Sequence, residues 1–88
     1  MFNPAIATAD TGLPGNVTPE QLFGLGMMYS TGQSMPLDLV SAHKWFNIAA
    51  TLGMKDAVRL RNEVAAEMTD REIAAAQRAA RDWLKSRH

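Results

Sequence analysis

Two histidines are the first side chains in this 88-residue sequence that could carry out chemistry. His43 lies in the middle of the chain, and His88 is its last residue. A metal site on a helix pairs histidine with a second histidine or a carboxylate about three or four residues away. Neither histidine has such a neighbour, so we expect no bound metal ion. We expect His43 to lie on the solvated side of its helix.

Glu63 and Glu67 are four residues apart, a spacing that could pair two carboxylates for general acid–base catalysis. Arg59 precedes Glu63 by four residues, and Arg71 follows Glu67 by four. Alternating charges at this spacing are typical of a solvated helix face, where each ion pair adds about 0.2–0.5 kcal/mol. The pattern therefore indicates a surface and no catalytic pair.

Nucleophiles and phosphate-binding loops are also missing from the sequence. The chain has no cysteine, which removes disulfides, thiolate metal ligands and thiol nucleophiles together. The serines lack the strand-to-helix context of a nucleophile elbow. They are Ser30, Ser34, Ser41 and Ser86. Gly24 and Gly26 fall inside a helical pattern rather than after a strand, where a phosphate loop would begin. We therefore predict a protein that is not an enzyme and needs no cofactor.

Charge is balanced over the whole chain and uneven along it. Nine basic and nine acidic residues give a formal net charge of zero, which argues against a dedicated nucleic-acid binder. Residues 55–88 nevertheless hold eight basic and six acidic residues. The basic residues near the end are Arg78, Arg81, Lys85 and Arg87. They could attract nucleic acid, a membrane or an acidic partner, but we favour stabilisation of a helix C-terminus.

The beginning of the chain lacks regular periodicity. Residues 1–17 contain two prolines and two glycines, and we expect an irregular tail that is either mobile or ordered by a partner. They have neither the basic start nor the apolar run of a signal peptide. No apolar stretch approaches the roughly 20 residues that cross a membrane. The expected location is the cytoplasm, and a partner in a membrane complex stays open.

Helix signals begin after this tail. Thr18 and Gln21 have the spacing of a capping box, and Pro19 occupies the first helical position between them. Leu22, Leu25, Gly26 and Tyr29 then share one helix face. Gly32 is expected to end this helix.

Three further helices are predicted from the same kinds of signals. The second runs from a cap at Asp38 to Gly53, and the third covers about residues 56–68. Thr69 and Glu72 form a second capping box, which opens a helix that reaches about Lys85. The apolar face of the second helix is expected to comprise Ala42, Trp45, Phe46, Ala49 and Ala50. Since no segment alternates at period two, we predict an all-α fold with antiparallel neighbouring helices.

Residues 25–57 combine small, aromatic and acidic positions in a repeated-helix pattern. The pattern residues are Leu25, Gly26, Tyr29, Gly32, Asp38, Ala42, Trp45, Ala49, Ala50, Gly53 and Ala57. In order and spacing they resemble the Sel-one-like repeat, a relative of the tetratricopeptide repeat. The resemblance implies an α-solenoid built of helix pairs, whose usual role is to bind other proteins.

The match covers one repeat and then weakens. Ser34 and Met35 replace the second turn glycine and the hydrophobic residue after it, and Gln21 replaces an alanine. In the next unit Arg61 and Asn62 stand at the Leu-Gly positions, and Ala65 replaces the tyrosine. We therefore expect a short solenoid domain over residues 18–88. It would contain one repeat (21–56) and a degenerate closing helix pair (57–85).

Surplus apolar residues give the best indication of function. Phe23 and Met27 lie off the first helix's main face, and an amphipathic helix needs only one such face. Together with Met28 and Trp83 they are the candidate partner-binding residues. The alternatives are internal packing of Phe23 and Met27 against the N-terminal tail, and a role for Trp83 in covering the last helix pair.

The family resemblance predicts a non-enzymatic interaction module, a small adaptor or accessory subunit of a larger assembly. Its partner would be another protein or a multi-subunit complex. One alternative is a homodimer formed through the first helix, which no preceding repeat covers. A less favoured alternative is nucleic-acid binding through the basic C-terminal helix.

Overall fold

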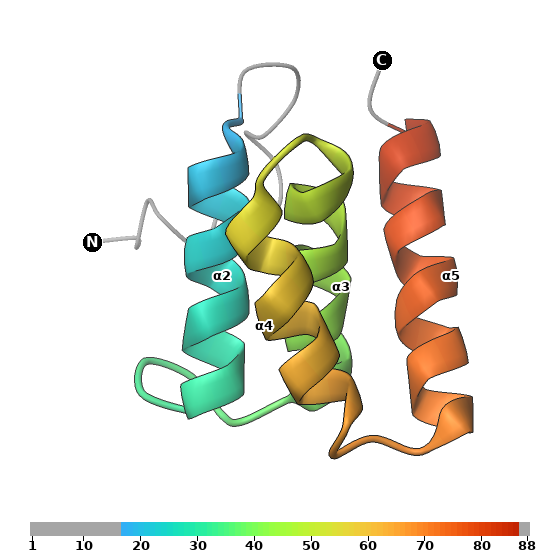
Figure 1. The fold of residues 1–88 in the computed structure, drawn as a ribbon. Coiled ribbons are helices and arrows are strands. Elements are labelled where there is room, and N and C mark those ends of the chain that lie inside the picture. Colours follow the sequence, from blue (N-terminus) through green and yellow to red (C-terminus); the bar gives the residue numbers. More distant parts are fainter. Residues whose placement is uncertain (1–16, 87–88) are drawn as a thin grey trace.

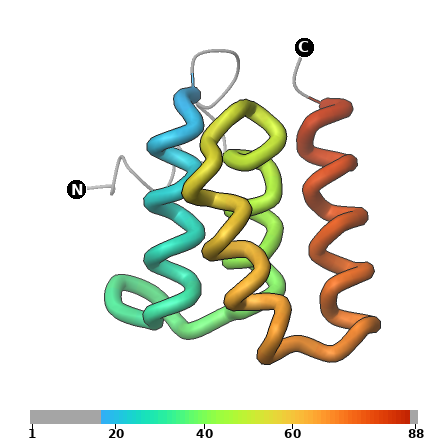
Figure 2. Tube along the Cα trace, in the orientation of Figure 1, coloured from blue at the N-terminus to red at the C-terminus, as the bar shows by residue number. Residues whose placement is uncertain are grey.

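The computed structural model describes residues 17–86, which form four α-helices and no strand (Figure 1). The helices are α2 (Pro19–Thr31), α3 (Leu39–Thr51), α4 (Lys55–Ala65) and α5 (Asp70–Ser86). Successive helices run antiparallel, as the trace in Figure 2 shows. The predicted all-α class is confirmed. None of these four helices has the length and apolar character needed to cross a membrane.

Helix α2 begins with the predicted capping box. The Gln21 backbone N–H donates to Thr18 Oγ1 at 3.1 Å, and the Thr18 N–H donates to Gln21 Oε1 at 2.9 Å. Val17, just before the cap, is buried in the same core cluster as Leu22. Apolar residues at these two positions form a hydrophobic staple, which fixes how the chain enters a helix. Val17, the last residue of the expected tail, has no regular secondary structure but packs into the core, and the rest of that tail (1–16) lies outside the described residues.

The turn between α2 and α3 is held at both ends. Gly32 adopts the left-handed conformation with φ of 70° and donates its N–H to the Met28 carbonyl at 3.0 Å. Asp38 donates its N–H to the Tyr29 carbonyl at 3.0 Å, and its carboxylate accepts the Ser41 N–H at 3.1 Å. Asp38 therefore caps α3 and ties its start to the end of α2.

Helix α3 is the centre of the molecule, because α2, α4 and α5 all pack against it. Its buried residues are Ala42, His43, Trp45, Phe46, Ile48 and Ala49. The predicted apolar face omitted His43 and Ile48. A helix with neighbours on several sides buries more than one stripe, which explains the difference.

The last two helices close the bundle. Helix α4 ends at Ala65, three residues before the predicted end, and Met68 in the following turn packs against the core. The capping box at the start of α5 is confirmed, since the Glu72 N–H donates to Thr69 Oγ1 at 3.1 Å. The Thr69 N–H donates to Glu72 Oε1 at 2.9 Å. Ala76 and Ala80 are the buried residues of α5.

Candidate protein-interaction surface

His43 is buried, with 3% of its surface exposed, so the prediction of a solvated histidine was wrong. It lies on the central helix, where neighbouring helices cover the side that would otherwise face water. The Arg61 side chain of α4 is close enough to affect its charge, and Arg61 Nη1 donates to Asn47 Oδ1 at 3.0 Å. The His43 Nδ1 atom has no hydrogen-bond partner among the described residues. His43 is thus a buried core side chain on α3, close to the polar contact between Arg61 of α4 and Asn47 of α3.

Burial lowers the pKa of His43 below its usual 6.5, and the positive charge of Arg61 lowers it further. An interaction of the ring with its own backbone, which does not reach hydrogen-bond geometry, raises the pKa and opposes both effects. Desolvation disfavours the charged imidazolium because it loses its hydration, and a neighbouring cation disfavours it by charge repulsion. The folded state therefore favours the neutral ring.

This shift predicts a loss of stability in mild acid. The unfolded chain binds a proton at His43 at a higher pH than the folded chain does, so stability falls as the pH drops below about 6.5. Urea unfolding between pH 7.5 and 5.5 should show the loss, and His43→Leu should remove most of it. An unchanged slope in the His43→Leu variant would show that other groups cause the acid sensitivity.

Glu63 and Glu67 are both exposed, but only Glu63 lies on α4, because Glu67 falls in the turn after that helix. Arg59 Nη1 and Glu63 Oε2 form an ion pair at 3.0 Å, with both side chains more than half exposed. Glu67 forms no ion pair with Arg71 in the part of the chain that the structure describes. Among residues 17–86 no three side chains of metal-ligating type come together. The residues that could carry out chemistry are therefore scattered over the described part of the chain.

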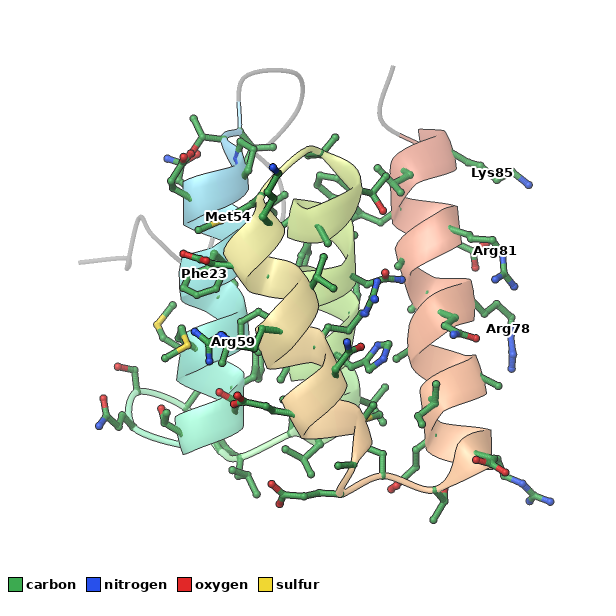
Figure 3. The ribbon with its side chains drawn as sticks, in the orientation of Figure 1. Phe23, Met54, Arg59, Arg78, Arg81 and Lys85 are labelled. Atoms are coloured by element: carbon green, nitrogen blue, oxygen red, sulfur yellow. The ribbon has the colours of Figure 1, made fainter. Side chains whose placement is uncertain are left out.

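Phe23 lies at the junction between the core and the surface. Its ring is tilted by 55° against the Phe46 ring of α3, with centroids 5.4 Å apart. The ring packs against both core clusters and is only half-buried. Met54, which Figure 3 also labels, packs against one of these clusters as well. Phe23 thus contributes to the core and borders the surface of α2.

Met27 and Met28 lie farther out on α2. Met27 is 37% exposed, Met28 is half-buried, and neither belongs to a core cluster. A Cβ atom placed on Gly24 would meet nothing within 4 Å, so the backbone is open there. Glu20 is the one charged residue of the helix. We call Gly24, Met27 and Met28, with Phe23 at their border, the α2 surface.

Trp83, the remaining candidate residue, lies on α5 and packs against α3. Its indole packs edge-on against Trp45, with centroids 5.7 Å apart and an interplanar angle of 83°. The side chain is half-buried against the main core cluster. The structure therefore places Trp83 as a covering residue between α3 and α5, separate from the α2 surface.

Sequence reasoning missed two features near these sites. The hydrophobic staple at Val17 and Leu22 could have been found, because the capping box fixes both positions. The burial of His43 depends on neighbouring helices and leaves no local pattern. In comparisons with known proteins, no family model, no curated protein and no solved structure matches this chain.

Proposed function

We propose that this chain is a non-enzymatic protein-interaction module, a small adaptor or accessory subunit, and that its partner packs on the α2 surface. The observation that carries the proposal is the exposed face of α2. Met27 and Met28 lie there outside the core, beside the open backbone at Gly24. The outer faces of α4 and α5 carry several charged side chains by contrast, although Val58 of α4 is exposed to the same extent as Met27.

The α2 surface has the chemistry of an apolar contact. Methionine side chains are flexible and polarizable, so they adapt to differently shaped partners. A glycine on a helix surface lets another backbone approach closely, because no Cβ stands in the way. With Glu20 as the sole charge of α2, a partner would desolvate few charges. The favoured partner is therefore an uncharged, apolar protein surface.

Membership of the Sel-one-like repeat family, and with it the solenoid arrangement, is part of the same proposal. Several pattern residues have structural roles that suit a two-helix unit. Gly26 lies against the Phe46 ring, Gly32 ends α2 and Asp38 caps α3. Gly53 follows α3 with a φ of 108°. These roles support a helix-pair unit whose outer helix is covered by another surface.

The test replaces Met27 and Met28 together with serine. Because neither side chain belongs to the core, stability should change by less than about 1 kcal/mol. Affinity for the protein that co-purifies with the tagged chain should fall roughly tenfold or more, since interface anchors dominate binding energy. Calorimetric titration with that purified protein measures the change. Phe23 is left intact, because it also packs against Phe46.

A matched control separates this surface from general effects. Ala74→Ser with Gln77→Ser changes two exposed residues of α5 and should leave the affinity unchanged. Equal affinity of the Met27/Met28 variant and the control would contradict the assignment of the α2 surface. Sedimentation equilibrium addresses the homodimer alternative. A two-chain mass that the Met27/Met28 variant abolishes would make a second copy the occupant.

A further inference from the structure

We infer that the outer face of α5 is a second docking surface, which fits an acidic helix of a partner protein. Four basic residues define it, and we call them the basic stripe. They are Arg71, Arg78, Arg81 and Lys85. All four are exposed, and Figure 3 shows the three that it labels, Arg78, Arg81 and Lys85, pointing away from the other helices.

The spacing places the basic stripe in one line. Relative to Arg71, the other three residues follow after seven, ten and fourteen positions. These are heptad intervals, which keep side chains on one seam of a helix. At 1.5 Å per residue the seam extends for about 21 Å. That length matches several turns of a second helix laid alongside.

Packing fixes the direction in which the stripe faces. Ala76 and Ala80 are buried against the core, and Trp83 packs on Trp45. The apolar side of α5 is therefore already occupied by α3. The basic stripe cannot turn toward the core without breaking these contacts. It therefore stays exposed on the outer side of a helix whose orientation is fixed by packing on α3.

The basic stripe forms no ion pair within the described part of the chain, although the exposed Asp82 carboxylate lies four residues after Arg78 and three before Lys85. Arg59 on α4, by contrast, does form an ion pair. Like charges three or four residues apart, such as Arg78 with Arg81 and Arg81 with Lys85, repel one another along a helix. Carboxylates from a partner would remove this repulsion.

Stabilisation of the helix terminus accounts for only one member of the stripe. Lys85 lies in the last turn of α5, where a cation is favourable. Arg71 lies in the first turn, where the helix dipole disfavours a cation, and Arg78 lies near the middle. Stabilisation of the helix C-terminus therefore explains the position of Lys85 but not the positions of the other basic residues.

The surroundings of the stripe favour a protein partner over nucleic acid or lipid. Asp70, Glu72 and Asp82 are exposed on the same helix and interrupt the positive field that a continuous phosphate backbone would require, whereas a partner helix can place its carboxylates opposite the basic residues alone. Membrane-surface helices insert an apolar face, and that face of α5 is buried on α3. Arginine binds carboxylates through paired hydrogen bonds. A helix with glutamates or aspartates at heptad spacing satisfies these conditions.

The experiment uses the full chain and a fluorescent helical probe peptide of about 20 residues. The peptide carries glutamate at heptad a and d positions, and a second version carries glutamine there. Fluorescence anisotropy should show binding of the glutamate peptide that weakens with added salt. Arg78→Gln with Arg81→Gln should weaken it roughly tenfold. Lys55→Gln with Arg59→Gln removes the same charge from α4 and should change it by less than about twofold.

Three results would overturn the inference. The first is equal binding of the glutamine and glutamate peptides. The second is a loss of affinity in the α4 control as large as the loss in the α5 variant. The third is tighter binding of a short DNA duplex or an anionic phosphatidylserine vesicle than of the glutamate peptide. The Met27→Ser/Met28→Ser variant should bind the peptide normally. The basic stripe and the α2 surface can therefore fail separately.

Discussion

Phe46→Ala is expected to lower the free energy of unfolding by about 3–5 kcal/mol, the usual cost of removing a buried phenylalanine side chain. Phe46 is fully buried at the centre of the cluster that it forms with Ala42 and Val64. The Phe23 ring packs on it from α2. A cavity at this point would loosen α2 and α4 together. Since small domains have only about 5–15 kcal/mol of stability, much of the chain would unfold at moderate temperature.

Urea unfolding followed by circular dichroism measures this loss. Phe46→Leu serves as the matched control, because it retains most of the apolar volume and should cost clearly less than Phe46→Ala. A loss below about 1 kcal/mol for Phe46→Ala would contradict the central position of this ring.

Gly26→Ala is expected to destabilise the protein by about 1–2 kcal/mol, although alanine favours a helix over glycine by up to about 1 kcal/mol. A Cβ on Gly26 would lie 2.6 Å from Phe46 Cδ1 and Cε1 and 3.0 Å from Cγ. Contact with Cγ, near the root of the side chain, means that the ring cannot avoid the methyl group by a small rotation. The ring is also enclosed on its other sides, since Phe46 has no exposed surface.

Gly24→Ala is the matched control for this prediction. It lies on the same helix, where an added Cβ meets nothing within 4 Å, so it should stabilise the protein by up to about 1 kcal/mol. Thermal or urea unfolding of the two variants should therefore give opposite signs. In a Phe46→Leu background the cost of Gly26→Ala should shrink, because the two side chains interact directly. Stabilisation by Gly26→Ala would show that α2 and α3 are not packed this closely.

Local signals in the sequence predicted the helix boundaries well. Thr18, Asp38 and Thr69 each bond to backbone N–H groups within three residues, so their effect depends on the sequence nearby. Gly32 ends α2 for a similarly local reason. The end of α4 was predicted too late, because Met68 packs on the core from the turn after the helix. An apolar residue at helical spacing can reach the core without being helical.

Burial in the middle of the molecule could not be predicted in the same way. The sequence of α3 has one favoured stripe, yet His43 and Ile48 outside that stripe are also buried. Their burial follows from the number of helices that surround α3, which is a property of the tertiary structure. The sequence showed that α2 has more apolar residues than one face needs, but it did not show which of them pack in the core and which stay at the surface. Phe23 packs on Phe46, whereas Met27 stays outside the core.

The two proposed surfaces differ in chemistry and location. The α2 surface is apolar and almost uncharged, while the basic stripe follows the outside of α5. Both helices pack against α3, which separates their outer faces. A module of this kind could hold two different partners at once, one by apolar contact and one by charge.

Site-specific photocrosslinking in the cells that produce the protein tests the central proposal most directly. A photoreactive phenylalanine analogue replaces Met27 in one variant and exposed Gln77 of α5 in a control. We predict a discrete crosslinked protein from position 27 that is absent from position 77, and that is lost when Met28→Ser is added. Equal crosslinking from both positions, or none from position 27 while the complex still co-purifies, would contradict a partner on the α2 surface.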